Sequence, residues 1–285
     1  MGQNTTKLLT LKSGRKLNVI LSSAFQKKET SQGAVICLSG FGCDHYNFSW
    51  IERELSQSDA YGNQFPLVMI DNRGMGESSQ ATEDYEIKDL ALDALECAEQ
   101  LELEEFHVAG ISMGGFIAQE LTLLAQDKIK SLCLLCTSSG GSEFIDLPLT
   151  TEEGLRAFYA LEEPLKSTSA VKATVHESLE QENRELFNDI VQLRRDHPVD
   201  GEQAIKQKRA VDRFLAQSFP LSEIQVPTLI MTGADDRYVN PENSKILNQK
   251  IKNSKLISIP KGDHLFFLEK SEEVTLELGK FWSEV

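Results

Sequence analysis

Residues 106–115, Phe-His-Val-Ala-Gly-Ile-Ser-Met-Gly-Gly, constrain the fold of this chain more than any other stretch. Residues 107–109 predict a short buried strand, and apolar residues at helical spacing predict a helix from about Met113. Between them, Gly110-Ile111-Ser112-Met113-Gly114 fits G-x-S-x-G, a tight turn in which only glycine fits beside the serine. We therefore expect the Ser112 hydroxyl to stand at the end of a sheet strand. It would lie at a helix N-terminus, where developing negative charge is favoured.

The composition is that of an acidic globular protein. Its 285 residues include 29 Lys and Arg against 44 Asp and Glu, giving a formal net charge of −15. This charge argues against nucleic acid and against an anionic membrane surface as partners. The five cysteines show no spacing typical of disulfide frameworks or zinc sites. No stretch resembles a membrane span or a signal-peptide core, so we expect a soluble cytoplasmic protein.

Strands and helices alternate over most of the chain. Residues 7–11 and 16–22 predict an antiparallel hairpin at a sheet edge. Alternation of strands and helices at crossover spacing is typical of a mostly parallel central sheet with helices on both faces. The predicted strands are 34–38, 67–70, 107–109, 132–136, 228–231 and 256–259, and the predicted helices are 48–55, 85–101, 113–124, 240–251 and 271–282.

Residues 141–220 interrupt this alternation. The gap between the strands predicted at 132–136 and 228–231 is too long for one crossover helix. Helical patterns at 152–161, 171–179, 185–193 and 203–215 fill it. We therefore expect a core domain formed by residues 1–140 and 221–285, with a helical insert over 141–220 that covers the site as a lid. The alternative is a helical decoration that makes a subunit contact.

A serine nucleophile needs a base within hydrogen-bond reach and a third group that orients the base. His264 lies just past the last predicted strand, at the edge where the C-terminal ends of parallel strands gather, so we predict it as the base. His107 opens the strand before Ser112, at the opposite end. His176 and His197 fall in the insert. We expect His45 to be a pocket or loop residue.

The orienting carboxylate should follow another strand. Asp235 and Asp236 come directly after the strand predicted at 228–231, whereas the loop after 132–136 offers only Thr137-Ser138-Ser139. Alternate loop residues point in different directions, so one aspartate should face His264 and the other solvent or Arg237. The residues alone leave that choice open. Either choice gives the chain order Ser, Asp, His.

Four motifs between residues 38 and 268 together resemble lid-bearing members of the α/β-hydrolase fold family. In the family's G-x-x-D pattern the last residue is the acid, so the resemblance implies Asp236 rather than Asp235. It also implies that Asp71 and Arg73 hold a turn. The motifs are Ser39-Gly40-Phe41-Gly42, Asp71-x-Arg73-Gly74-x-Gly76-x-Ser78, Gly110-x-Ser112-x-Gly114-Gly115, and Gly233-x-x-Asp236 followed by Gly262-Asp263-His264.

The resemblance implies an oxyanion hole formed by the backbone N–H groups of Phe41 and Met113. The family's first oxyanion turn is usually His-Gly, but here it is Ser39-Gly40. This departure concerns the support of the loop, because the donor is a backbone group. We expect the apolar residues Phe41, Met113 and Phe144 to line the substrate pocket.

Serine at position 112 excludes haloalkane dehalogenases and epoxide hydrolases, which carry aspartate there. Residues 110–119 and 134–139 are similar to 3-oxoadipate enol-lactonases and neighbouring carboxylesterases. We therefore expect a serine hydrolase that cleaves a small carboxylic ester or lactone through an acyl-enzyme, with no cofactor and no metal. The alternatives are thioester or carbon–carbon hydrolysis or a cofactor-free lyase reaction by the same triad, and a ligand receptor that retains the hydrolase fold.

Overall fold

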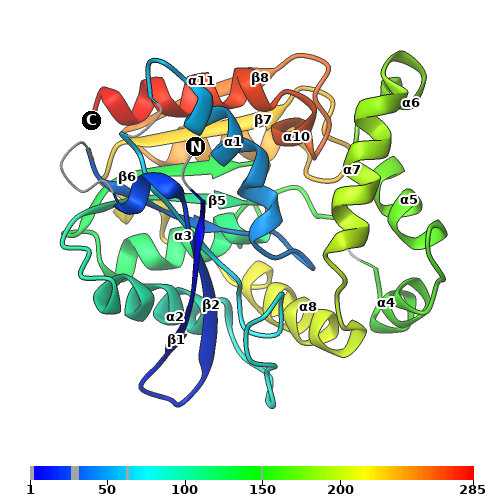
Figure 1. Cartoon of the computed structure of the whole chain (residues 1–285), viewed down its shortest axis with the longest axis horizontal. Helices are drawn as coiled ribbons and strands as arrows, with labels where there is room; N and C mark the ends of the chain where they lie inside the picture. The colour runs from blue at the N-terminus through cyan, green and yellow to red at the C-terminus, as the bar shows by residue number, and fades with distance from the viewer. Residues whose placement is uncertain (1–2, 27–31, 62–63, 149) are drawn as a thin grey trace.

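The computed structural model describes residues 3–26, 32–61, 64–148 and 150–285, and a single sheet forms its centre (Figure 1). The strands are β1 (Thr5–Thr10), β2 (Lys16–Leu21), β3 (Ala34–Leu38), β4 (Leu67–Ile70), β5 (Phe106–Ile111), β6 (Ile129–Leu135), β7 (Thr228–Gly233) and β8 (Ser254–Ile259). Their order across the eight-stranded sheet is β1-β2-β4-β3-β5-β6-β7-β8. β1 and β2 form an antiparallel hairpin at one edge, and β3 to β8 are parallel. The predicted mostly parallel α/β architecture is confirmed.

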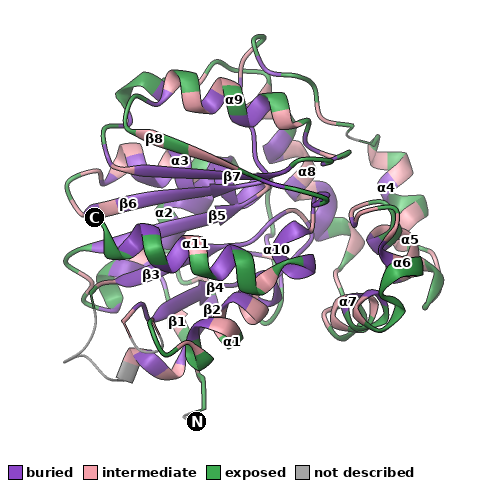
Figure 2. Ribbon diagram, turned by 90° about the horizontal axis from the view of Figure 1, so that it is seen from above, coloured by how far each residue is buried: buried purple, intermediate pink, exposed green. Residues whose placement is uncertain are grey.

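Helices cover both faces of the sheet. They are α1 (Ser49–Gln57), α2 (Ile87–Gln100), α3 (Met113–Leu124), α9 (Pro241–Lys250), α10 (Phe266–Glu269) and α11 (Ser271–Ser283). Along β3, Ile36 and Leu38 point into a core with α2, α3 and α9. Val35 and Cys37 point into the opposite core with α1 and α11. Figure 2 shows these central strands buried between the two helical layers, as expected for parallel strands covered on both faces.

The register of the parallel strands brings two loops together at their C-terminal ends. Leu38, the last residue of β3, lies opposite Gly110 of β5. The turn that begins at Ser39 therefore lies beside the turn at Ser112. The loops after β7 and β8 open at the same edge of the sheet, because these strands run parallel to β5.

In the described part of the chain between β6 and β7, five α-helices follow one another: α4 (Glu152–Tyr159), α5 (Leu165–Lys172), α6 (Leu179–Glu182), α7 (Arg184–Asp196) and α8 (Gly201–Leu215). We call them the inserted helices. The helix predicted over residues 171–179 is wrong, because α5 ends at Lys172 and α6 begins only at Leu179. The backbone between them pairs with the core instead, where Thr174 O accepts from Leu265 N and His176 N donates to Glu269. In Figure 2, α4 to α7 extend beyond the end of the sheet.

Two predicted helix starts have different outcomes. Asn240 caps α9 as predicted, because its side chain accepts a hydrogen bond from Glu242 N. Ser271 does not cap α11. It is the first residue of that helix, and its hydroxyl donates to Glu54 of α1 at 3.1 Å.

All five cysteines are buried and free. Burial raises the pKa of the Cys97 thiol to about 12, so that thiol is neutral near pH 7. Within the described ranges, no helix combines the length and the apolar character needed to cross a membrane.

Candidate active site

The turn at Ser112 has the strained geometry that its sequence predicts. Ser112 joins β5 to α3 with a φ of +54° and a ψ of −118°, in the region that side chains other than glycine rarely adopt. A Cβ on Gly110 would collide with the Gly114 carbonyl, and a Cβ on Gly114 would collide with the Leu38 carbonyl. Thr137 holds the turn by donating its hydroxyl to Ser112 O at 2.7 Å. The surrounding backbone thus fixes where the Ser112 hydroxyl points.

His264 connects the Ser112 hydroxyl to a buried carboxylate. Its Nε2 lies 3.1 Å from Ser112 Oγ, and its Nδ1 lies 3.0 Å from Asp236 Oδ2. The other carboxylate oxygen of Asp236 accepts hydrogen bonds of 2.8 Å from the backbone N–H groups of Tyr238 and Val239. Asp236 and His264 are both buried. These bonds fix Asp236 in the orientation that meets the imidazole.

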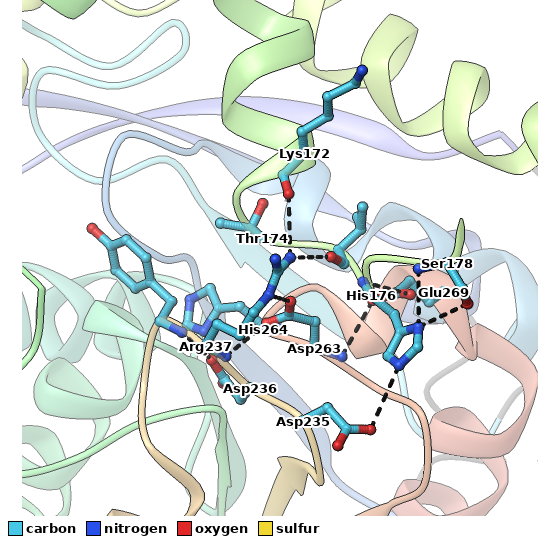
Figure 3. Close-up of polar contacts among 12 residues, drawn as sticks. Lys172, Thr174, His176, Ser178, Asp235, Asp236, Arg237, Asp263, His264 and Glu269 are labelled. Atoms are coloured by element: carbon cyan, nitrogen blue, oxygen red, sulfur yellow. Dashed lines mark hydrogen bonds and ion pairs between the residues drawn. The ribbon is translucent and has the colours of Figure 1, made fainter. Parts of the chain in front are cut away.

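Asp235 points away from this arrangement. Its side chain is about half exposed, and Oδ2 lies 3.7 Å from His176 Nε2 in the segment between α5 and α6. Figure 3 shows Asp236 beside His264 and Asp235 directed toward His176. The two neighbouring aspartates therefore have different partners, and Asp236 is the one that meets His264.

The backbone next to His264 is braced by Asp263 and Arg237 (Figure 3). The buried Asp263 carboxylate accepts from His264 N at 2.8 Å and from the Arg237 guanidinium at 2.5 Å. Arg237 also donates to the carbonyl oxygens of Lys172 and Val175. Arg237 thus pairs with Asp263 rather than with Asp235. It links the loop after β7 to the inserted helices.

Glu269 lies behind the same loop. Its carboxyl group accepts from His176 N at 3.1 Å and from Asp263 N at 3.4 Å. Burial raises the pKa of Glu269 to about 7, outweighing the two backbone donors. Glu269 lies between the His264 loop and the inserted segment, and its raised pKa means that its protonation changes near neutral pH.

Two backbone N–H groups lie beside Ser112. Among the described residues, neither the Phe41 nor the Met113 N–H donates to another protein atom. The loop carrying Phe41 is held on both sides: Asn47 Oδ1 accepts from Gly40 N at 2.9 Å, and Gln207 Oε1 accepts from Gly42 N at 2.8 Å. These two amides supply the support that the Ser39-Gly40 turn needed. Neither amide was predicted from the sequence, because Gln207 lies 165 residues from Gly42 and no local signal connects them.

Asp71 and Arg73 hold turns near the site, in agreement with the prediction. Asp71 is fully buried and accepts from His45 N at 2.8 Å and from the Asn18 side chain at 2.8 Å. Arg73 donates to Asp93 at 2.7 Å. His45 also bonds Asp71 through Nδ1, at 2.9 Å, so it is a loop residue and does not meet Ser112.

The remaining histidines lie away from Ser112. His107 is fully buried at the opposite end of β5, where its Nδ1 lies 2.7 Å from Ser131 Oγ. His197, at the end of α7, bonds Asp44 Oδ2 at 2.9 Å. Possible metal-ligand atoms of Asp44, His45 and His197 lie within 4.8 Å of one another. Each is already hydrogen bonded, and the His197–Asp44 contact joins α7 to the loop after β3.

A cavity of about 380 Å³ opens onto Ser112 and His264. Phe41, Tyr159 and Tyr238 are among its lining residues. A smaller apolar recess beside Ser112 includes Met113, as well as Phe116, Leu147 and Val211. Phe41 and Met113 therefore lie where the pocket was predicted.

Phe144 lines neither of these two cavities. The turn closed by Phe144 N and Gly141 O places its ring in the core with α2 and α3, where it is buried. Leu147, three residues later, lines the recess.

Comparisons with known proteins agree with this fold. A sequence model of the alpha/beta hydrolase fold matches residues 33–271. The chain is similar to a 2-hydroxy-6-oxononadienedioate/2-hydroxy-6-oxononatrienedioate hydrolase of Paraburkholderia xenovorans, with 27% identity over 83% of this chain and 81% of the relative. It is also similar to 3-oxoadipate enol-lactonase 1 of Acinetobacter baylyi, with 23% identity over 93% of this chain and 92% of the relative. The enol-lactonase structure from Burkholderia xenovorans superposes with a TM-score of 0.81 at 18% identity, covering 97% of this chain and all of that one. The chain therefore belongs to the alpha/beta hydrolase fold family and is a hydrolase of that family.

Proposed function

We propose that this hydrolase cleaves a small carboxylic ester or lactone through an acyl-enzyme on Ser112. The observation that carries the proposal is the continuous set of hydrogen bonds from Ser112 Oγ through His264 to Asp236, beside two backbone N–H groups that donate to no protein atom of the described residues. Ser112, His264 and Phe41 line the cavity of about 380 Å³, a size suited to a small molecule, and Met113 lines the smaller recess beside Ser112. The relative named as a 3-oxoadipate enol-lactonase supports cleavage of a lactone. The relative named as a 2-hydroxy-6-oxononadienedioate/2-hydroxy-6-oxononatrienedioate hydrolase supports hydrolysis but does not favour an ester or lactone bond.

Each group has a defined part in the proposed reaction. His264 Nε2 takes the Ser112 proton as the oxygen attacks the substrate carbonyl, and the N–H groups of Phe41 and Met113 receive the oxyanion. Asp236 holds the imidazole and stabilises its charged form. The protonated His264 then gives its proton to the leaving alcohol. It next activates a water that attacks the acyl-enzyme and returns Ser112 to its free form.

The inserted helices would act as a lid in this proposal. Tyr159 of α4 and Ala170 of α5 line the cavity that opens onto Ser112. A substrate would enter between these helices and the sheet edge, and their closure would separate the reacting groups from bulk solvent.

The test is a screen of acyl substrates with purified wild-type and Ser112→Ala protein. We expect turnover of a short 4-nitrophenyl ester or a lactone by the wild type, and its loss in the variant. Faster turnover of a thioester or of a carbon–carbon substrate would reassign the bond that is cleaved. Tight ligand binding with no turnover of any acyl substrate would favour a receptor and contradict the proposal.

A further inference from the structure

The charge of the cavity differs from that of the protein. The chain carries a formal net charge of −15, yet no aspartate or glutamate is among the described residues that line the main cavity or its apolar recess. The cationic lining residues are Arg194 in the main cavity and Lys208 in the recess. Lys208 is paired, because its Nζ lies 2.5 Å from an Asp212 carboxylate oxygen. Arg194 differs from Lys208 in this respect.

Among the described residues, the hydrogen-bond partners of the Arg194 side chain are neutral. Its Nη1 donates to the Tyr46 hydroxyl at 3.1 Å and lies 3.9 Å from Cys43 Sγ. No carboxylate lies within ion-pair distance of it in the part of the chain that the structure describes. A guanidinium has five N–H donors, so most of its donor capacity is unused. The next residue, Arg195, is exposed and bonds Gln192 on the surface of the same helix.

An arginine held in a cavity without a counter-ion pays a desolvation cost that a bound anion would recover. The planar donor fork of a guanidinium matches a carboxylate, which it binds with two parallel hydrogen bonds. The Arg194 guanidinium also lies near the loop that carries Phe41. It contacts Cys43, two residues beyond Phe41, and two residues of chain span at most about 7 Å. One small molecule can therefore reach both Arg194 and the N–H of Phe41.

We propose that Arg194 is a specificity-determining residue that binds a carboxylate of the substrate, so the substrate class is a small ester or lactone carrying a second, free carboxylate group. This inference rests on the proposed function for the scissile bond and adds the chemistry of the remote end. The Tyr46 hydroxyl fixes Nη1, and the other guanidinium donors meet the anion.

Arg194 also links α7 to the loop after β3, so a purely structural role must be distinguished from anion binding. Loss of a structural link would slow every substrate alike. Loss of an anion site would slow only substrates that carry the anion. The test therefore compares two substrates of equal chain length, mono-4-nitrophenyl adipate and 4-nitrophenyl hexanoate.

For the wild type, we expect kcat/KM for the adipate ester to exceed that for the hexanoate ester by about 10- to 100-fold, the range for a charged hydrogen bond. In Arg194→Gln this ratio should fall to about 1, mainly through KM of the adipate ester. Arg194→Lys, which keeps the charge but loses the fork, should give an intermediate ratio. Arg195→Gln removes the same charge from the surface and should keep the wild-type ratio. An equal ratio in the wild type and in Arg194→Gln would overturn the proposal.

A binding measurement keeps the inference separate from the chemistry at Ser112. Calorimetry with adipate and with uncharged 1,6-hexanediol requires no turnover. We expect adipate to bind the wild type and Ser112→Ala alike, and to bind Arg194→Gln at least tenfold more weakly. Absence of adipate binding to the wild type would overturn the inference even if esters are hydrolysed. Binding that depends on Arg194, without hydrolysis of any ester, would instead contradict only the proposed function.

Discussion

Asp236 Oδ2 lies 3.0 Å from Nδ1 of His264, whereas the adjacent carboxylate of Asp235 is directed to His176 on the inserted segment. Two residues of the same type, one peptide bond apart, thus differ completely in what they contact. The difference comes from the turn after β7. Its backbone donors at Tyr238 and Val239 hold one carboxylate and leave the other about half exposed.

This difference predicts that the same substitution has a large effect on activity at Asp236 and almost none at Asp235. Asp236→Asn should lower kcat/KM for a 4-nitrophenyl ester by about 10³- to 10⁴-fold, because the amide cannot stabilise the imidazolium and can favour the wrong tautomer. Asp235→Asn should leave the rate within about twofold, because the group is exposed and does not contact His264. Steady-state kinetics of both variants provides the comparison. A larger loss in Asp235→Asn would show that the acid has been assigned to the wrong residue.

The hydrogen bond that supports the loop carrying Phe41 gives a second prediction. Asn47 is buried, and its Oδ1 holds Gly40 N at 2.9 Å, one residue before the proposed donor at Phe41. Asn47→Ala should lower kcat by about tenfold with little change of KM, because the donor is needed most in the transition state.

A matched control for Asn47→Ala is Asn240→Ala, which removes an N-cap of α9. The control should lower the free energy of unfolding by about 1 kcal/mol and leave kcat unchanged. If Asn47→Ala lowers only the stability, as the control does, the loop does not depend on this amide for catalysis.

Much of this arrangement could be predicted from local sequence. The parallel strands appear as short apolar runs, and the turn at Ser112 is encoded within five residues. His264 could be placed because it follows the last strand directly. These features depend on neighbours in the chain, where periodicity and glycine spacing carry the information.

The features that were missed depend on contacts between distant segments. The helix predicted across Thr174 is broken because the backbone there pairs with Leu265, 91 positions further along the chain. Gln207 and Arg194 lie on amphipathic helices whose sequence does not show which loop they meet. Phe144 was placed in the pocket on its apolar character alone, although a turn directs it into the core.

Glu269 gives a third prediction, on the pH dependence of stability. Burial raises its pKa from the ordinary value of 4.5 to about 7 in the folded protein. The folded state then favours the proton. The corresponding stability is fully present below about pH 4.5 and is lost as the pH rises through about 7. Between pH 6 and pH 8 this group alone should lower the free energy of unfolding by about 1 kcal/mol.

Denaturant unfolding at several pH values checks this prediction. Glu269→Gln should show a smaller loss of stability than the wild type from pH 6 to pH 8. Glu273→Gln, which alters an exposed carboxylate in the first turn of α11, should keep the wild-type pH dependence. Equal slopes for Glu269→Gln and the wild type would mean that Glu269 does not hold its proton in the folded protein.

Covalent trapping tests the claim that Ser112 is a nucleophile activated by His264. Wild-type protein treated with a fluorophosphonate should gain one adduct per chain by intact mass, and peptide mapping should place it on Ser112. Ser112→Ala should gain none, and His264→Ala should react far more slowly. An adduct on another residue, or equal labelling of the wild type and Ser112→Ala, would contradict the claim.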